Sequence, residues 1–157
     1  MAVILVLAAV VMGPSEAAIR RKKLAACAET MRRLHLSLVL YANEHDGAFP
    51  TIERAEKSGD ALNLLVPAYT ADKSLLGCEG GHFAYAMGIK KGERSVLVAD
   101  RLERVDSGSR NTLSFPERGN HDGQNGNVLF ADGHVEQLGA SATRNIRAPS
   151  HAVLLNP

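Results

Sequence analysis

Apolar residues recur with helical spacing over the first third of the chain. Leu24, Met31 and Leu38 lie seven residues apart, and further apolar residues fall between them at steps of three or four. This spacing places them along one face of an amphipathic helix. Ser15 is a suitable N-cap residue for such a helix. The pattern therefore predicts one helix over about residues 15–44.

An uncharged and almost wholly apolar run, residues 1–12, precedes Gly13–Pro14 and the basic run Arg20–Lys23. As a helix the apolar run would span roughly 18 Å, short of the ~30 Å hydrocarbon core of a bilayer. A secretory signal peptide needs its basic stretch before the apolar run, whereas here the basic run follows it. Three interpretations stay open: a truncated membrane helix, a reverse signal-anchor, or a buried helix of a soluble core. We treat residues 1–14 as an apolar membrane or filament-core segment and residues 15–157 as one domain.

Short apolar runs separated by turn residues predict strands in the second half of the chain. Ser95–Ala99 is β-branched and apolar, which is typical of a buried strand. Two more strands are expected, at His82–Met87 and Ala152–Leu155. Residues 60–70 should form a short helix broken by Pro67, and residues 103–126 should form a loop. A long helix followed by strands predicts an α+β fold, with the helix packed on a small C-terminal antiparallel sheet in a globular part of about residues 50–157.

A β-hairpin is predicted near the C-terminus, where Asn127–Ala131 and His134–Leu138 flank Asp132-Gly133. Asp-Gly is the dipeptide that best suits a two-residue type I′ turn, in which both central residues have positive φ. We therefore expect Asp132 and Gly133 to form such a turn.

Composition excludes one class of partner and leaves the thiol chemistry open. The chain of 157 residues has 18 Lys and Arg against 17 Asp and Glu, and aromatic residues make up only 4%. A near-neutral chain with few aromatics offers neither a basic surface nor a stacking platform for nucleic acid. Cys27 and Cys78 match no zinc-binding spacing. They can form a disulfide in an oxidising compartment or remain two buried thiols.

Two sequence strings resemble a known family. One is Tyr41–Pro50, which contains Tyr41, Asp46, Gly47 and Pro50 in the pattern YAN-x-x-D-G-x-F-P, and the other is the hairpin string Val128–Val135. Together they resemble type IV pilin-like proteins of the type II secretion pseudopilin G-like group, prepilin-type proteins that carry a C-terminal His-x9-Asp-Gly hairpin motif. Ten residues separate His121 from Asp132 here, one more than in that motif. Cys78 and Leu97–Arg101 also resemble family positions, and the resemblance covers most of residues 1–138.

The resemblance implies a structural subunit rather than an enzyme. We expect a pseudopilin of a type II secretion or type IV pilus-like filament, with no cofactor, that acts in protein secretion or pilus assembly. Its partners would be other pilin-like subunits and the secretion or pilus machinery of the inner membrane. A single N-terminal transmembrane helix would anchor it, with the globular domain in the periplasm of a Gram-negative-type bacterium. The family leader, with its basic stretch and peptidase site, is absent from the residues after Met1, so we expect a truncated N-terminus.

Two alternatives to the filament subunit come from other classes of protein. One is a membrane-anchored periplasmic binding module. The other is a metal-dependent hydrolase, because Gly119–Asp122 and Gly133-His134 imitate parts of a metallophosphoesterase signature. That signature needs several His and Asp ligands for two metals, and its upstream Asp-x-His is absent.

Histidine and carboxylate residues near the hairpin are the candidate metal ligands. His121, Asp132 and His134 are suitable for a mononuclear site with a borderline cation. A Ca²⁺ site would instead use oxygen ligands from Asp100, Asp106 and Asp122, although no EF-hand spacing is present. The alternative that we favour is structural, with His121 and Asp132 pinning the loop of residues 119–127 onto the hairpin.

Overall fold

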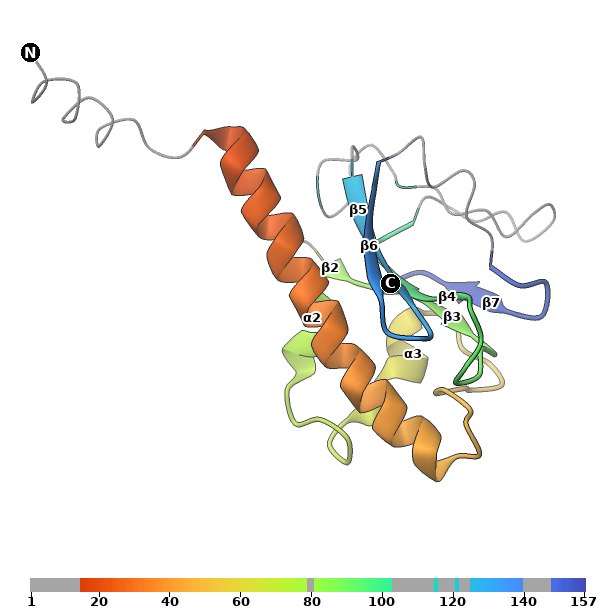
Figure 1. Ribbon diagram of the computed structural model, residues 1–157. Coiled ribbons are helices and arrows are strands. Elements are labelled where there is room, and N and C mark those ends of the chain that lie inside the picture. The colour runs from red at the N-terminus through yellow and green to blue at the C-terminus, as the bar shows by residue number, and fades with distance from the viewer. Residues whose placement is uncertain (1–14, 79–80, 103–114, 116–120, 122–124, 140–147) are drawn as a thin grey trace, which may run out of the picture.

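The computed structural model describes residues 15–78, 81–102, 115, 121, 125–139 and 148–157. Its architecture is α+β, with a long N-terminal helix, α2 (Glu16–Glu44), lying against a five-stranded antiparallel sheet (Figure 1). This confirms the predicted fold class and the predicted long helix. The apolar run of residues 1–12 lies outside the described residues, and no helix within the described part combines the length and hydropathy needed to cross a bilayer.

Both ends of α2 follow from local sequence. At the start, Ser15 is the N-cap, and its hydroxyl accepts a hydrogen bond from the backbone N–H of Ala18 at 3.3 Å. At the end, Asp46 and Gly47 adopt positive φ angles of 51° and 79°. The N–H of Gly47 thereby reaches back to the carbonyl oxygen of Ala42 at 2.8 Å, which satisfies a helix-end acceptor. The left-handed conformation of Gly47 therefore ends the helix.

The helix is divided along its length into an exposed part and a packed part. Every residue from Ser15 to Lys23 is exposed, and Leu24 is the first buried one. From there on, one face is buried, and it includes Cys27, Met31, Leu34 and Leu38. The first turns of α2 therefore project beyond the sheet (Figure 1).

The sheet has the strand order β6-β5-β4-β3-β7, and every neighbouring pair is antiparallel. Its strands are β3 (Ala84–Met87), β4 (Val96–Ala99), β5 (Asn125–Phe130), β6 (Val135–Gly139) and β7 (Val153–Leu155). A separate two-stranded sheet pairs β1 (Gly77–Cys78) with β2 (Gly81–His82), and the short helices are α3 (Ser58–Leu62), η1 (Asn63–Leu65) and η2 (Lys73–Leu76). The predicted edge strand near the C-terminus is confirmed as β7, and the predicted strand at residues 82–87 is divided into β2 and β3.

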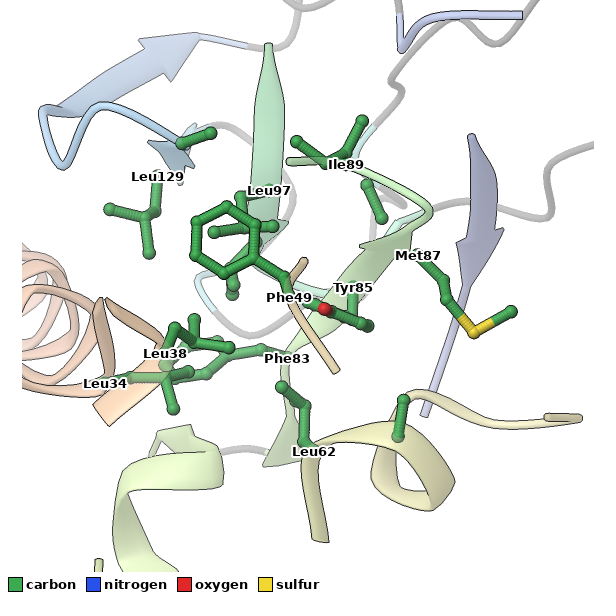
Figure 2. Packing of buried hydrophobic residues seen from close by; sticks show 14 of the residues in the cluster. Leu34, Leu38, Phe49, Leu62, Phe83, Tyr85, Met87, Ile89, Leu97 and Leu129 are labelled. Carbon is green, nitrogen blue, oxygen red and sulfur yellow. The ribbon is translucent and has the colours of Figure 1, made fainter. Parts of the chain in front are cut away.

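The core lies between α2 and the sheet. Leu34 and Leu38 of the helix pack with Phe83 and with Leu97 and Leu129 of the sheet (Figure 2). Burial of apolar surface at about 25 cal/mol per Å² is the main force that holds the helix in place.

The Phe49–Pro50 end of the family-like string enters this core. Phe49 is buried, and the carbonyl oxygen of Pro50 accepts a hydrogen bond from the Tyr85 hydroxyl at 2.9 Å. Burial raises the pKa of Tyr85, which keeps this donor protonated. Tyr41 stacks on His45 with ring centroids 3.8 Å apart. The residues of this string thus act in helix termination and core packing.

The hairpin turn differs from the type I′ turn predicted from Asp132-Gly133. Phe130 and His134 close the hairpin, because the N–H of Phe130 donates to the carbonyl oxygen of His134 at 3.0 Å. The N–H of Gly133 donates to the carbonyl oxygen of Phe130 at 2.9 Å, and Gly133 has a φ of +95°, whereas Asp132 does not have a positive φ. The loop therefore has three residues, with Gly133 alone in the left-handed region, as in a type I turn followed by a glycine bulge.

Candidate thiol and metal site

Four chemically reactive side chains meet where α2 crosses the sheet. They are Cys27 on α2, Cys78 on β1, Asp100 directly after β4, and His121. One ligand atom from each lies within 4.8 Å of all the others. Cys27 and Cys78 form a disulfide, which decides between the two alternatives left open for these cysteines.

Each cysteine is positioned by its element. Cys27 belongs to the buried stripe of α2, one turn after Leu24. Cys78 ends the short strand β1, which follows η2 and lies beside the helix. The disulfide therefore joins the helix to the segment that leads into the sheet, across 51 residues of sequence.

Asp100 is a buried carboxylate held in place by Asn127. Its side chain is only 3% exposed. Its Oδ2 accepts hydrogen bonds from the backbone N–H of Asn127 at 2.7 Å and from the Asn127 side-chain amide at 3.1 Å. Burial of a carboxylate is costly unless hydrogen bonds compensate it. The amide of Asn127 supplies that compensation and fixes the orientation of the carboxylate.

His121 and the two sulfurs complete the cluster around this carboxylate. Nε2 of His121, whose side chain is 8% exposed, lies 3.3 Å from Oδ2 of Asp100 and 3.9 Å from Sγ of Cys78. Oδ1 of Asp100 lies 3.3 Å from Sγ of Cys27 and 3.9 Å from Sγ of Cys78. The carboxylate thus faces sulfur with one oxygen and imidazole with the other.

A hollow of about 970 Å³ opens beside the cluster. Cys27, Cys78 and His121 contribute to its wall. Lysine side chains from α2 and η2 also line it, namely Lys22, Lys23 and Lys73. The cluster is consequently accessible from one side although its carboxylate and imidazole are buried.

The structure separates the residues that were grouped as metal candidates. Asp100 and His121 come together with the cysteines, whereas Asp132 and His134 pair with each other at the hairpin. There, Asp132 Oδ1 contacts Nδ1 of His134 and accepts the His134 backbone N–H at 3.2 Å. Hydrogen bonds from the side chain and then the backbone of His134 lower the pKa of Asp132. This pair is about half exposed and also includes Glu136, 3.3 Å from Nε2 of His134.

The expected contact between His121 and Asp132 is therefore not among those of the described residues, and His121 instead contacts Asp100. Asp106 and Asp122, the other oxygen ligands considered for Ca²⁺, lie outside the described residues. Sequence reasoning missed Asn127 altogether. Its only signal was a polar residue at the start of an apolar strand, which is too common a pattern to be specific.

A scan against protein-family models, a search of curated proteins and a search of solved structures each found no match for this chain. In the oxidised state the site is a covalent link between α2 and β1. In the reduced state it offers two thiols, an imidazole and a carboxylate to the same point.

Proposed function

We propose that this chain is a pilin-like structural subunit, a pseudopilin of a type II secretion or type IV pilus-like filament, which assembles through its N-terminal helix. The observation that supports this most directly is the division of α2. One part of the helix is packed on the sheet from Leu24 onward, while the turns from Ser15 to Lys23 are exposed. A helix that leaves its own domain in this way can pack against the helices of neighbouring subunits.

The mechanism that we propose is assembly rather than catalysis. Residues 1–12 form an apolar run directly upstream of the projecting turns. Apolar helices of adjacent subunits would bundle in the core of the filament by removing this surface from water, at about 25 cal/mol per Å². The sheet would then face outward, and the basic run Arg20–Lys23 would lie at the boundary between the apolar filament core and the outer domains.

The disulfide supports an extracytoplasmic location for the globular domain. Disulfides persist in oxidising compartments such as the periplasm and are rare in the cytosol. We therefore propose a protein held at the inner membrane of a Gram-negative-type bacterium by its N-terminal segment, with the sheet in the periplasm. Its partners would be other pilin-like subunits and the inner-membrane machinery, and nucleic acid would not be a partner.

In-cell photo-crosslinking tests the assembly proposal. A photoreactive amino acid is introduced at Ile19, an exposed residue of the projecting turns, and separately at Leu64 in η1 as a matched control. The two side chains are similarly exposed, at 42% and 39%. In cells with an active type II secretion system, we expect a ladder of crosslinked multimers from position 19 and monomer from position 64. Monomer from both positions, or equal ladders from both, would contradict assembly through the helix.

The membrane-anchored binding module is a second candidate, and the hollow beside the cluster favours it. A cavity of about 970 Å³ with lysine side chains and an apolar residue, Ile19, on its wall would suit a small anionic ligand with an apolar part. In that case the photoreactive group at position 19 would capture a small molecule and give no multimers.

A further inference from the structure

We propose that reduction of the Cys27–Cys78 bond converts this cluster into a binding site for one zinc-class divalent ion, with Cys27, Cys78, Asp100 and His121 as the ligands. The disulfide and the metal would then exclude each other. This proposal concerns the folded domain alone and does not depend on filament assembly.

The ligand set identifies the class of ion. Two thiolates, an imidazole and a carboxylate are the donors that tetrahedral Zn²⁺ takes in proteins. Calcium and magnesium take oxygen donors, so the two sulfurs disfavour them. The sequence spacing of the cysteines gave no sign of this site, because its ligands come from four separate segments that the fold brings together.

The distances between the donor atoms fit one central ion. With Zn–S near 2.3 Å and Zn–N or Zn–O near 2.0–2.1 Å, donor atoms at tetrahedral angles lie roughly 3.3–3.8 Å apart. Sulfur to carboxylate distances here are 3.3 Å for Cys27 and 3.9 Å for Cys78. Those two distances are to Oδ1 of Asp100, whereas its Oδ2 lies 3.3 Å from Nε2 of His121, and Sγ of Cys78 lies 3.9 Å from the same nitrogen. The two bonded sulfurs would have to move apart to about 3.8 Å, and donor atoms that now lie up to 4.8 Å apart would have to approach by as much as about 1 Å.

A disulfide by itself does not explain the carboxylate and the imidazole. A cystine sulfur carries no hydrogen, so neither sulfur can donate a hydrogen bond to the oxygen of Asp100 that faces it. Asn127 compensates the burial of Oδ2, but the disulfide gives Oδ1 no hydrogen bond, so the disulfide alone does not require a buried Asp100 and His121 beside the sulfurs. A divalent ion would bind both groups together with the thiolates and would balance their charge.

Asn127 provides the outer support that metal ligands usually have. Its backbone N–H and side-chain amide both donate to Oδ2 of Asp100, and the same amide reaches the carbonyl oxygen of Leu24 on α2 at 3.1 Å. Such contacts orient a ligating carboxylate before the ion arrives. The hollow bordered by Cys78 and His121 gives the ion and a reductant a route to the sulfurs.

The conversion balances as two steps. A dithiol reductant transfers two electrons and two protons to the disulfide, which yields the Cys27 and Cys78 thiols and the oxidised, disulfide form of the reductant. The divalent ion then displaces one proton from each thiol, and two protons are released. Reoxidation by a disulfide donor reverses the sequence and expels the ion.

The test uses Co²⁺, whose tetrahedral thiolate complexes absorb strongly, and Zn²⁺ as its competitor. The full chain is reduced under anaerobic conditions, freed of reductant and titrated with Co²⁺, alongside the oxidised chain. We expect the reduced chain to develop thiolate-to-cobalt and visible bands that saturate at one equivalent and are abolished by Zn²⁺. We expect no such bands from the oxidised chain. Absence of the bands from the reduced chain, or equal bands from both forms, would overturn the proposal.

Variants show whether the two non-sulfur ligands take part. Asp100→Asn and His121→Ala should each weaken Co²⁺ binding by more than about tenfold, since even outer-shell partners of ligands are worth ~10–100-fold. Asp132→Asn and His134→Ala change the same residue types at the exposed hairpin pair and should leave binding unchanged. If the Asp100→Asn chain fails to fold in its oxidised form, His121→Ala decides alone. Binding unaffected by His121→Ala, or lost in the hairpin variants, would show that the ion is not held by this cluster.

Discussion

Asp100 and Asn127 bind each other through backbone and side chain at once. The N–H of Asp100 donates to the carbonyl oxygen of Asn127 at 3.0 Å. In the other direction, the backbone N–H and the side-chain amide of Asn127 both donate to Oδ2 of Asp100. The side-chain amide also donates to Leu24 of α2. A single fully buried amide therefore joins β5, the end of β4 and the long helix.

Substitution of Asn127 should be strongly destabilising. Asn127→Ala removes the side-chain amide that donates to Asp100 and Leu24, although the backbone N–H stays, and should cost about 1–3 kcal/mol because buried acceptors lose a partner. Asn127→Asp should cost more, since it adds a second carboxylate beside Asp100. Urea unfolding at neutral pH measures both. Asn43→Ala is the control, because this exposed residue of α2 makes one surface hydrogen bond, to Lys91, and should change stability by no more than about 0.5 kcal/mol. Equal losses for positions 43 and 127 would contradict the role of Asn127.

The packed face of α2 can be tested with two leucines of the same helix. Leu38 is fully buried, whereas Leu36 is 65% exposed. Leu38→Asp should cost several kcal/mol, about 4, because it combines a lost apolar contact with a buried unpaired charge. Leu36→Asp should stay within about 0.5 kcal/mol. Thermal unfolding of the two variants makes the comparison, and similar melting temperatures would show that the packed face is assigned incorrectly.

Gly133 is required both for its backbone conformation and for its contact with the helix. A Cβ at this position would lie 2.7 Å from Cε1 of His35, whose ring contacts the carbonyl oxygen of Ala131 at 3.2 Å. Gly92 has a similar φ, +91° against +95°, but a Cβ there would meet nothing within 4 Å.

Gly133→Ala should therefore cost about 1 kcal/mol more than Gly92→Ala, since both carry the left-handed strain, of roughly 1–2 kcal/mol, but only one displaces His35. Combining Gly133→Ala with His35→Ala should remove the extra loss. A double-mutant cycle by chemical denaturation measures this coupling. If the two alanine variants are equally stable, the hairpin does not press on the helix as described.

The Asp132–His134 pair should give a small dependence of stability on pH. Hydrogen bonds from His134 lower the pKa of Asp132 in the folded protein. A lowered folded-state pKa stabilises the protein above the carboxyl's unfolded value of about 3.9, and this stabilisation is lost as the pH falls through the folded value. Because the Asp132 side chain is 44% exposed, the contribution should stay below about 1 kcal/mol.

Unfolding of the wild type and of Asp132→Asn between pH 7 and about pH 2 measures this contribution. The wild type should be the more stable at pH 7, and the difference should disappear at the acid end. A difference that persists unchanged at low pH would show that it does not come from the ionised carboxylate.

Much of the fold follows from local pattern. The seven-residue spacing of Leu24, Met31 and Leu38 gave the packed face of α2, and Ser15 gave its start. These features depend only on residues close in sequence. The prediction of a two-residue hairpin turn was wrong, because Asp-Gly is compatible with both a two-residue and a three-residue loop. The closing pair Phe130–His134 decides between the two loops.

The site depends on contacts between distant residues, which no local pattern encodes. Cys27 and Asp100 are 73 residues apart in sequence yet 3.3 Å apart in space. The grouping of His121 with Asp132 relied on their nearness in the chain. Strand β5 lies between them, however, and its six residues extend the chain by roughly 20 Å. His121 and the Asp132–His134 pair therefore lie at opposite ends of strand β5.

The position of Cys27 has a mechanical consequence. This cysteine lies one turn inside the point where α2 becomes buried, so any force applied to the projecting end of the helix meets it before it reaches Met31, Leu34 or Leu38. With the disulfide closed, the load passes through a covalent bond into β1, and the apolar interface beyond it is not sheared. With the bond open, the same force would separate the helix from the sheet progressively, one helical turn after another. The Cys27–Cys78 link would thus protect the packed face of the helix from tension applied at its projecting end.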